Sequence, residues 1–358
     1  MRKILHVGTH KTATTSFQAC LRNNRADLLK QGLIFPDLSK VGLHDSVGHH
    51  SLIGLLASKP EKGRSVASRV IKSFSSTADD DAALLISSER CYRHAIGLKK
   101  DEKPRQRRRN FVNLLAETFG ADTEVAIVLR RPDSYAESSY QETIKKTNRT
   151  DTIQSFWDSP GVRMRLDYRF QLRLFQKAFE RVNVFIYEDL IQAPDGPEMA
   201  LLRGLGLNVA LASPPERRNT SLHAYLTEYK RLMNYQKLPP AQLKNLIERL
   251  LEIQRAGEFD WMTRKMAFLG LTRRREIMGQ YEEDLKWIVS EFFAEREMDL
   301  FPEPAEAHPV FERLPIDVFE MIHQKVCETL SDRALFYGPG EGMVERGIRN
   351  VSGLFTNS

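Results

Sequence analysis

The chain has little cysteine: only Cys20, Cys91 and Cys327 among 358 residues. They are far apart and lack the close spacing of paired metal ligands or of a disulfide framework, so we interpret them as reduced, mostly structural thiols. The neighbouring histidines His49 and His50 likewise have no companion cluster of cysteines or carboxylates. The sequence therefore predicts no metal site.

The chain also lacks any apolar run of about 18 residues, the length that spans a membrane. Its first residues, MRKILHVGT, contain no apolar segment typical of a signal peptide. We therefore expect no integral membrane segment and a cytoplasmic location. Repeats and low-complexity tracts are absent as well.

What the chain does have is a globular composition with a positive net charge. Apolar residues make up 41% and charged residues 28% of the sequence, and the net charge is +6. This balance favours anionic partners. Lys99–Arg109 is the densest basic stretch, and it reads either as a solvated helix start or as a contact for an acidic ligand. No aromatic residues alternate with these charges, so we do not expect a nucleic acid partner.

A strand, loop and helix pattern begins the chain. The apolar run Ile4–Val7 ends at Gly8, and an amphipathic pattern follows over Phe17–Leu29. Such a connection presents backbone N–H groups and a helix N-terminus to a phosphate, and Lys11 adds a positive charge. The predicted anion-binding residues are Gly8, Thr9, His10, Lys11, Thr12, Ala13, Thr14, Thr15 and Ser16.

This loop is not a Walker A motif, because no glycine directly precedes Lys11. It resembles instead the phosphosulfate loop of sulfotransferases that use 3′-phosphoadenosine-5′-phosphosulfate (PAPS), whose common form is Lys-[Ser/Thr]-Gly-Thr-Thr. Ala13 stands where that glycine usually lies, and we expect alanine to be tolerated there with a negative φ. The resemblance implies that Lys11 neutralises the departing phosphate during catalysis.

A second motif follows the predicted strand Val125–Leu129. Arg130 ends that strand, Pro132 begins a helix, and Ser138 lies about two turns into it. An arginine and a serine in these positions can hold one phosphate together. The pattern resembles the 3′-phosphate site of the same family, strand-Arg-x-Pro followed by Ser-x-Tyr, which Arg130, Ser138 and Tyr140 match.

Two further residues receive structural roles. We assign Arg131 to the surface or to a salt bridge, and the strand-end acids of the sequence YEDL (Tyr187–Leu190) to capping the next helix. A third family-like segment lies in Glu216–Leu222, which resembles an Arg-x-Asn-x-Ser loop that closes over the nucleotide in bacterial relatives. The resemblance implies nucleotide contacts from Arg217, Asn219 and Ser221.

The predicted catalytic base lies at the end of another strand. The apolar run Ala82–Ile86 is followed by two serines and Glu89. In open α/β sheets, ligands bind beyond the carboxyl ends of the strands, so Glu89 is well placed to act as the base. His50, and then His49, are the alternatives, and a structural role for Glu89 also stays open.

The resemblance implies a sulfotransferase that uses PAPS as co-substrate, releases adenosine 3′,5′-bisphosphate and needs no metal. The acceptor would be a small molecule or glycan with a hydroxyl or amine, acidic acceptors included, and the basic stretch Lys99–Arg109 favours a carbohydrate. Two alternatives remain: a P-loop-type kinase using ATP and magnesium, and a catalytically silent nucleotide-binding protein. The oligomeric state and the exact acceptor stay open.

The predicted fold is α/β, with a mainly parallel sheet of about five strands, helices on both faces as in P-loop proteins, and a C-terminal helical extension. The strands are expected near residues 3–8, 33–35, 83–88, 124–129 and 182–187. We expect residues 1–222 to form the PAPS-binding core and residues 223–358 to pack on it as a helical extension. One long helix is expected over Phe156–Phe179.

Overall fold

The computed structural model describes residues 1–9, 11–44, 47–75, 81–97, 101–212, 221–296, 299–303 and 308–328. The chain forms two compact units, each made from several stretches of sequence. The first unit comprises Met1–Tyr135, Pro160–Thr220 and Glu276–Glu303. The second comprises Ala136–Ser159, Ser221–Arg275 and Pro304–Ser358.

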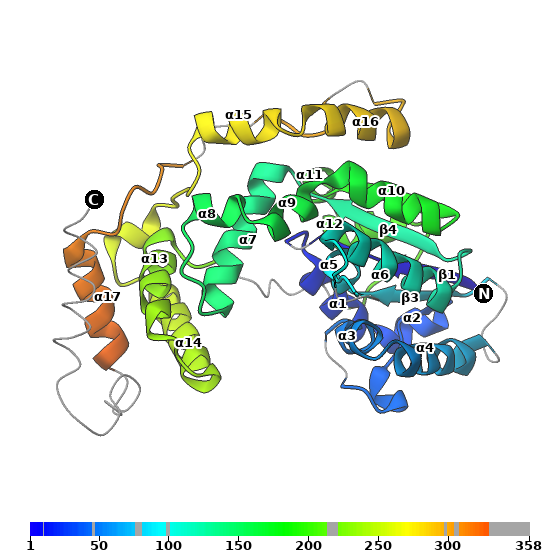
Figure 1. Ribbon diagram of the computed structural model, residues 1–358. Coiled ribbons are helices and arrows are strands. Elements are labelled where there is room, and N and C mark those ends of the chain that lie inside the picture. The colour runs from blue at the N-terminus through cyan, green and yellow to red at the C-terminus, as the bar shows by residue number, and fades with distance from the viewer. Residues whose placement is uncertain are drawn as a thin grey trace. The chain divides into compact units, whose positions relative to one another are not determined.

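The first unit is built on an open parallel sheet of five strands in the order β2–β3–β1–β4–β5 (Figure 1). The strands are β1 (Arg2–His6), β2 (Leu33–Ile34), β3 (Ala83–Ser87), β4 (Glu124–Leu129) and β5 (Arg181–Ile186). The predicted α/β class and parallel sheet are confirmed. Each strand lies within two residues of its expected position at either end.

The central strand β1 aligns the ends of its two neighbours. His6 pairs with Ser87 of β3 on one side and with Ala126 of β4 on the other. Backbone pairing continues past the strand, since the Thr9 N–H donates to the Val128 carbonyl at 3.2 Å. The segments that leave β1, β3 and β4 therefore emerge at the same edge of the sheet.

Helices cover both faces of the sheet, because strands β3 and β4 are buried along their whole length and have no polar face to expose. Side chains from α1, α2 and α12 form one core with Ile4, Leu85 and Val128. On the opposite face, Ile71 of α4 and Phe119 of α6 approach Leu84 and its neighbours.

The helices of the first unit are α1 (Thr14–Asn23), α2 (Arg25–Lys30), η1 (Leu38–Val41), α3 (His50–Ser58), α4 (Pro60–Ser75), α5 (Arg90–Arg93), α6 (Pro104–Phe119), α9 (Pro160–Leu166), α10 (Tyr168–Ala178), α11 (Tyr187–Leu190), α12 (Gly196–Gly204) and α16 (Glu282–Phe292). Two helices have residues in both units: α7 (Pro132–Lys146) and α15 (Leu271–Gly279).

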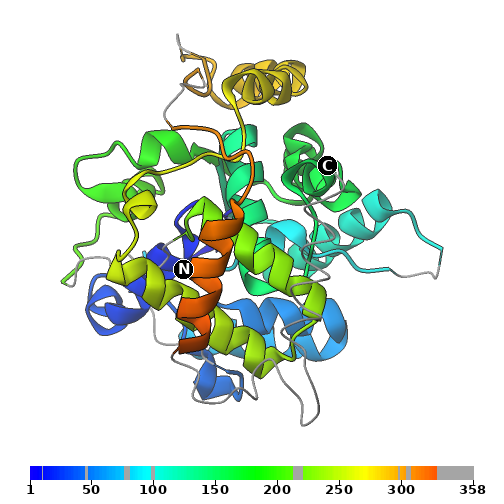
Figure 2. The ribbon, with the colours of Figure 1, turned by 90° about the vertical axis from the view of Figure 1, so that its left-hand side faces the viewer.

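The second unit is helical over its described residues. Its helices are α8 (Ile153–Trp157), α13 (Ala224–Met233), η2 (Asn234–Gln236), α14 (Pro240–Ala256), η3 (Asp260–Thr263) and α17 (Ile316–Glu328). Figure 2 shows α17 alongside α13 and α14, and the three share a core that includes Leu226, Leu250 and Ile322.

The single helix predicted over Phe156–Phe179 is wrong. The chain forms the separate helices α8, α9 and α10 there. Pro160 begins α9, and the Asp167 carboxylate accepts from the Phe170 N–H at 3.0 Å to begin α10. A proline and a capping acid inside an apolar pattern each favour the start of a new helix over continuation of the preceding one. Among the described residues, no helix has the length and apolar character needed to cross a membrane.

Candidate functional site

The predicted phosphate loop lies at the point where the connections from two adjacent strands run to opposite sides of the sheet. From β1 the chain runs to β2 on one side of the sheet, and from β4 it runs to β5 on the other. This reversal between adjacent parallel strands creates a crevice at their carboxyl ends, the usual ligand position in open α/β sheets. Gly8–Ala13 leaves β1 at this point, and Arg130 leaves β4.

The loop is held in a tight curve by its own side chains. The Thr12 hydroxyl donates to the Thr9 carbonyl at 2.6 Å, and Thr14 Oγ1 lies 3.2 Å from Thr12 Oγ1. A Cβ on Gly8 would lie only 2.8 Å from Thr14 Oγ1. Gly8 is thus required for close approach. The Thr12 and Thr14 hydroxyls bond within the loop, whereas no hydrogen bond from the Thr15 hydroxyl occurs among the described residues.

Two residues of the loop adopt the left-handed backbone conformation, Lys11 at φ 70° and Ala13 at φ 55°. The expectation of a negative φ at Ala13 is wrong. The chain must turn sharply from the loop into α1, and Ala13 is the residue at the helix N-cap. Alanine has no side-chain oxygen to accept from the first amides of α1, so this helix start lacks the usual side-chain cap and suits an anion.

Arg130 connects the end of β4 to the loop. Its Nη1 donates to the Lys11 carbonyl at 2.6 Å, and its guanidinium carbon lies 5.0 Å from the Tyr187 ring centre. Its own carbonyl accepts from the Tyr168 hydroxyl at 2.6 Å. Arg130 Nε is buried and has no hydrogen-bond partner within the described part of the chain. The guanidinium is therefore positioned by the protein but retains a donor for an anionic ligand.

The two leading candidates for the base, Glu89 and His50, lie side by side. His50 Nε2 is 3.5 Å from Glu89 Oε2, and His50 Nδ1 is 2.9 Å from the Ser88 hydroxyl. The Glu89 side chain is 17% exposed, and the His50 side chain is 21% exposed. The sequence presented them as alternatives, whereas the structure makes them one pair.

A buried polar network extends from this pair to the floor of the phosphate loop. The Gln18 amide on α1 donates to Glu89 Oε2 at 3.3 Å and to the Ser87 hydroxyl at 3.0 Å. The Ser87 hydroxyl also lies 2.8 Å from His6 Nδ1. Sequence reasoning missed Gln18 and His6. The signal that could have identified them is a polar residue on the apolar face of a strand or helix, because a buried polar side chain must find hydrogen-bond partners.

His49 has a structural role. Its Nδ1 accepts from the Ser87 N–H at 2.9 Å, so Nε2 carries the hydrogen and donates to the Pro36 carbonyl at 3.1 Å. The ring is buried against Phe35. Because both nitrogens bond to the backbone, His49 is a poor candidate for proton transfer.

The remaining predicted contacts are spread over the chain. Ser138 and Tyr140 lie on the part of α7 that belongs to the second unit, where Tyr140 is buried and packs edge-on against Phe156 and Phe268. Ser221 is an exposed residue of that unit. Three other predicted residues, His10, Arg217 and Asn219, lie outside the described residues.

Arg131 forms the salt bridge expected of it, whereas the expectation that a strand-end acid of YEDL caps the next helix is wrong. Arg131 Nε lies 2.7 Å from the buried Asp133 carboxylate. Glu188 Oε1 accepts from the Arg131 N–H at 3.0 Å, and burial raises the pKa of this carboxyl group. Glu188 thus satisfies a backbone amide just before α7, rather than capping the helix that directly follows β5.

No group of three metal-binding side chains occurs among the residues that the structure describes. A scan against models of known protein families and a search of curated proteins found no match to this chain.

Proposed function

We propose that the chain is a sulfotransferase that uses PAPS as sulfuryl donor. One observation carries the proposal. Arg130, at the end of β4, donates to the Lys11 carbonyl, and its buried Nε has no hydrogen-bond partner in the described residues. A phosphate at this position would supply the missing acceptor through a charge-assisted hydrogen bond.

The loop also fits the other end of such a donor. Lys11, the uncapped start of α1 and the Thr15 hydroxyl provide positive charge and hydrogen-bond donors to one side of Gly8. Stabilising charge on the departing phosphate is the electrostatic task of this reaction, and donors fixed in place perform it most effectively. Cationic side chains at both Lys11 and Arg130 are consistent with a donor that carries two phosphate groups.

During transfer, the acceptor oxygen or nitrogen forms a bond to sulfur while the bond between sulfur and the phosphate oxygen breaks. The phosphate leaves with the electron pair, and the acceptor proton passes to a base. Glu89 is suited to receive it, because Oε2 is engaged by Gln18 and lies beside His50, while Oε1 has no hydrogen bond within the described residues. His50 and Gln18 would act as positioning residues.

The donor class is tested by calorimetric titration with adenosine 3′,5′-bisphosphate, adenosine 5′-monophosphate and ATP with magnesium. We expect micromolar binding of the bisphosphate alone. The Arg130→Ala variant should weaken it about 100-fold, because a charged phosphate contact contributes up to about 3 kcal/mol.

Arg131→Ala is the matched control, since the adjacent guanidinium pairs with Asp133 and should leave bisphosphate affinity unchanged. Tighter binding of ATP with magnesium would support the kinase alternative. Equal affinity for the bisphosphate and the monophosphate would contradict a 3′-phosphate site.

The base is tested by sulfuryl transfer from labelled PAPS to the best acceptor in a panel of sugars and small alcohols. We expect Glu89→Gln to lower kcat by about 10²-fold or more, with bisphosphate affinity retained. His50→Asn should lower kcat less, because it removes only a neighbour of the carboxylate.

The relative losses in kcat separate these roles. A larger loss in Glu89→Gln than in His50→Asn supports Glu89 as the base, whereas the reverse order would assign proton transfer to His50.

A further inference from the structure

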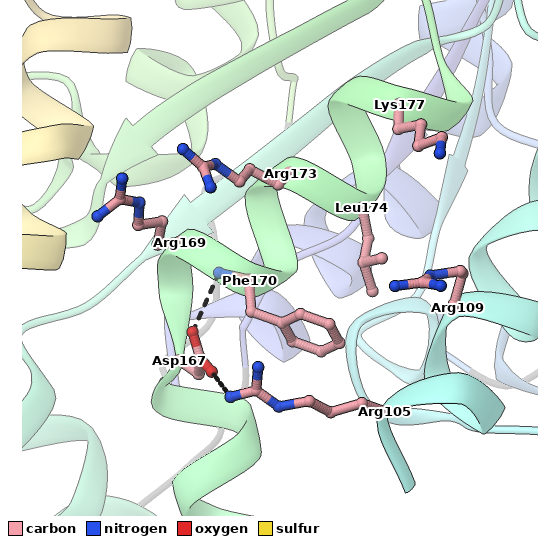
Figure 3. Close-up of a pocket in the computed structure, with 8 residues that line it drawn as sticks. All are labelled: Arg105, Arg109, Asp167, Arg169, Phe170, Arg173, Leu174 and Lys177. Carbon is pink, nitrogen blue, oxygen red and sulfur yellow. Dashed lines mark hydrogen bonds and ion pairs between the residues drawn. The ribbon is translucent and has the colours of Figure 1, made fainter. Parts of the chain in front are cut away.

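A basic cavity lies in the first unit between α6 and α10, and it is separate from the residues proposed to bind the donor. Its volume is about 400 Å³, within the range of sites for small ligands. Figure 3 shows its lining: Arg105, Arg109, Asp167, Arg169, Phe170, Arg173, Leu174 and Lys177. Five of these side chains are cationic, and one is acidic.

Few of these cations have a direct ion-pair partner within the described ranges, although the Asp284 carboxylate attracts Arg105, Arg169 and Arg173. Asp167 bonds to Arg105 at 2.5 Å, but within the described ranges the other four cations form no ion pair. Arginines elsewhere in the chain commonly have a carboxylate partner, as Arg203 has Asp195. Clustering like charges in one cavity costs stability, so their accumulation here suggests an anionic ligand.

Two of the arginines are held in place by an aromatic ring. The guanidinium carbons of Arg169 and Arg173 lie 5.4 and 5.1 Å from the ring centre of Trp287 on α16. This contact orients a guanidinium without cancelling its charge. Arg169 Nε is also buried with no hydrogen-bond partner in the described part of the chain.

The cavity also has an apolar wall. Figure 3 shows Arg105 and Arg109 reaching from α6 toward Phe170 and Leu174 of α10. Arg105 lies over the Phe170 ring at 4.7 Å, so the ring is not open for stacking of successive bases as in sites for single-stranded nucleic acids. Apolar carbon beside several guanidinium groups suits a sugar ring that carries sulfate or carboxylate groups.

The cavity adjoins the candidate donor site through the first turn of α10. Tyr168 lies between Asp167 and Arg169 in sequence, and its hydroxyl donates to the Arg130 carbonyl at 2.6 Å. One buried residue of α10 therefore links the wall of the cavity to the candidate donor site.

We propose that this cavity binds an anionic oligosaccharide segment of the acceptor, bearing sulfate or uronate groups, beside the unit that receives the sulfuryl group. Only the role of this ligand as the sulfuryl acceptor rests on the proposed function. The binding itself can be tested without any turnover.

The test is calorimetric titration of the full chain with a heparin hexasaccharide, with and without saturating adenosine 3′,5′-bisphosphate. Arg109→Ala/Lys177→Ala changes both walls at exposed positions, and it should weaken hexasaccharide binding about tenfold or more. Arg69→Ala/Arg107→Ala removes the same charge from exposed positions outside the lining, and it should change affinity less than about twofold.

Maltohexaose, a neutral sugar, and hexathymidylate, a single-stranded DNA, are titrated in the same way as control ligands. Binding of the sulfated sugar alone, sensitive to the cavity variant, supports the proposal. Equal losses in both double variants, tighter binding of hexathymidylate, or no sulfated-sugar binding would overturn it. Melting curves of both variants verify that they fold. Bisphosphate affinity is measured in the same experiments, so sugar binding without bisphosphate binding would contradict the proposed function while leaving the cavity as a glycan site.

Discussion

Ala13 occupies a backbone conformation that disfavours every residue with a side chain except asparagine and aspartate. Its φ of 55° follows from the sharp turn between the loop and α1. Glycine adopts this region without the clash between Cβ and the carbonyl oxygen. We therefore expect Ala13→Gly to raise the free energy of unfolding by about 0.5–1 kcal/mol.

Denaturant titration checks this expectation, with Ala19→Gly as the control within the same helix. Ala19 lies buried in the interior of α1, where glycine should cost about 1 kcal/mol. Destabilisation by both substitutions would show that the backbone at Ala13 is not strained.

His6 should make stability depend on pH. Burial lowers the pKa of His6 from its ordinary value of 6.5 to about 3. The unfolded chain therefore takes up the proton first, and the stability that is complete above pH 6.5 declines as the pH falls toward 3. The decline attributable to His6 should approach about 1.4 kcal/mol per pH unit.

Titration of the carboxylates adds to the acid response of any chain, so the measurement compares wild type with His6→Asn. An asparagine retains a polar contact for Ser87 but does not titrate. The stability difference between the two proteins should shift against wild type on acidification. Parallel stability curves would contradict the prediction.

At this scale, the sequence predicted Lys11, Glu89 and Arg130 as site residues because each follows a strand, and His50 because it lies at the start of a helix. It could not predict that Glu89 and His50 form a pair. That contact depends on how α3 begins relative to β3, which no local pattern specifies. Nor could it predict that Thr12 and Thr14 bond within the loop, since hydroxyl direction follows from the curve of the backbone.

The close packing of α3 against α4 depends on Gly63, a residue of α4. A Cβ on Gly63 would lie 2.6 Å from the Leu56 Cα, a backbone atom that cannot move aside cheaply. We expect Gly63→Ala to lower the free energy of unfolding by about 2 kcal/mol, because the two helices must separate.

Gly161 provides the matched control, because it also lies in a helix but a Cβ there meets nothing within 4 Å. Gly161→Ala should stabilise the chain by about 0.5 kcal/mol through helix propensity. Thermal melting of the two variants should therefore give shifts of opposite sign. Shifts of the same sign would contradict the packing argument.

The strands β3 and β4 were the most predictable elements, because strands buried throughout a parallel sheet are largely continuous apolar runs with polar residues at both ends. Helix limits were less predictable where an apolar pattern persisted across a break. The division between α9 and α10 depends on Asp167, whose carboxylate can cap a new helix or sit on the surface of a continuing one. Only the tertiary contacts decide between these states.

For the whole molecule, the pattern of strands and helices was sufficient to predict an α/β fold with a parallel sheet. The strand order could not be predicted from this pattern, since the same five strands can be arranged in many ways. The expected division into residues 1–222 and 223–358 remains a prediction about domains. The compact units are assembled from alternating stretches, and the chain passes from one to the other five times.

This alternation has a consequence for protein synthesis. The first unit includes Glu276–Glu303, so its last helix, α16, is translated long after the sheet. Trp287 on that helix orients two arginines of the basic cavity. Until the ribosome has made this segment, a nascent chain has the sheet but not the completed unit. Folding of the complete first unit must therefore wait until α16 has been synthesised.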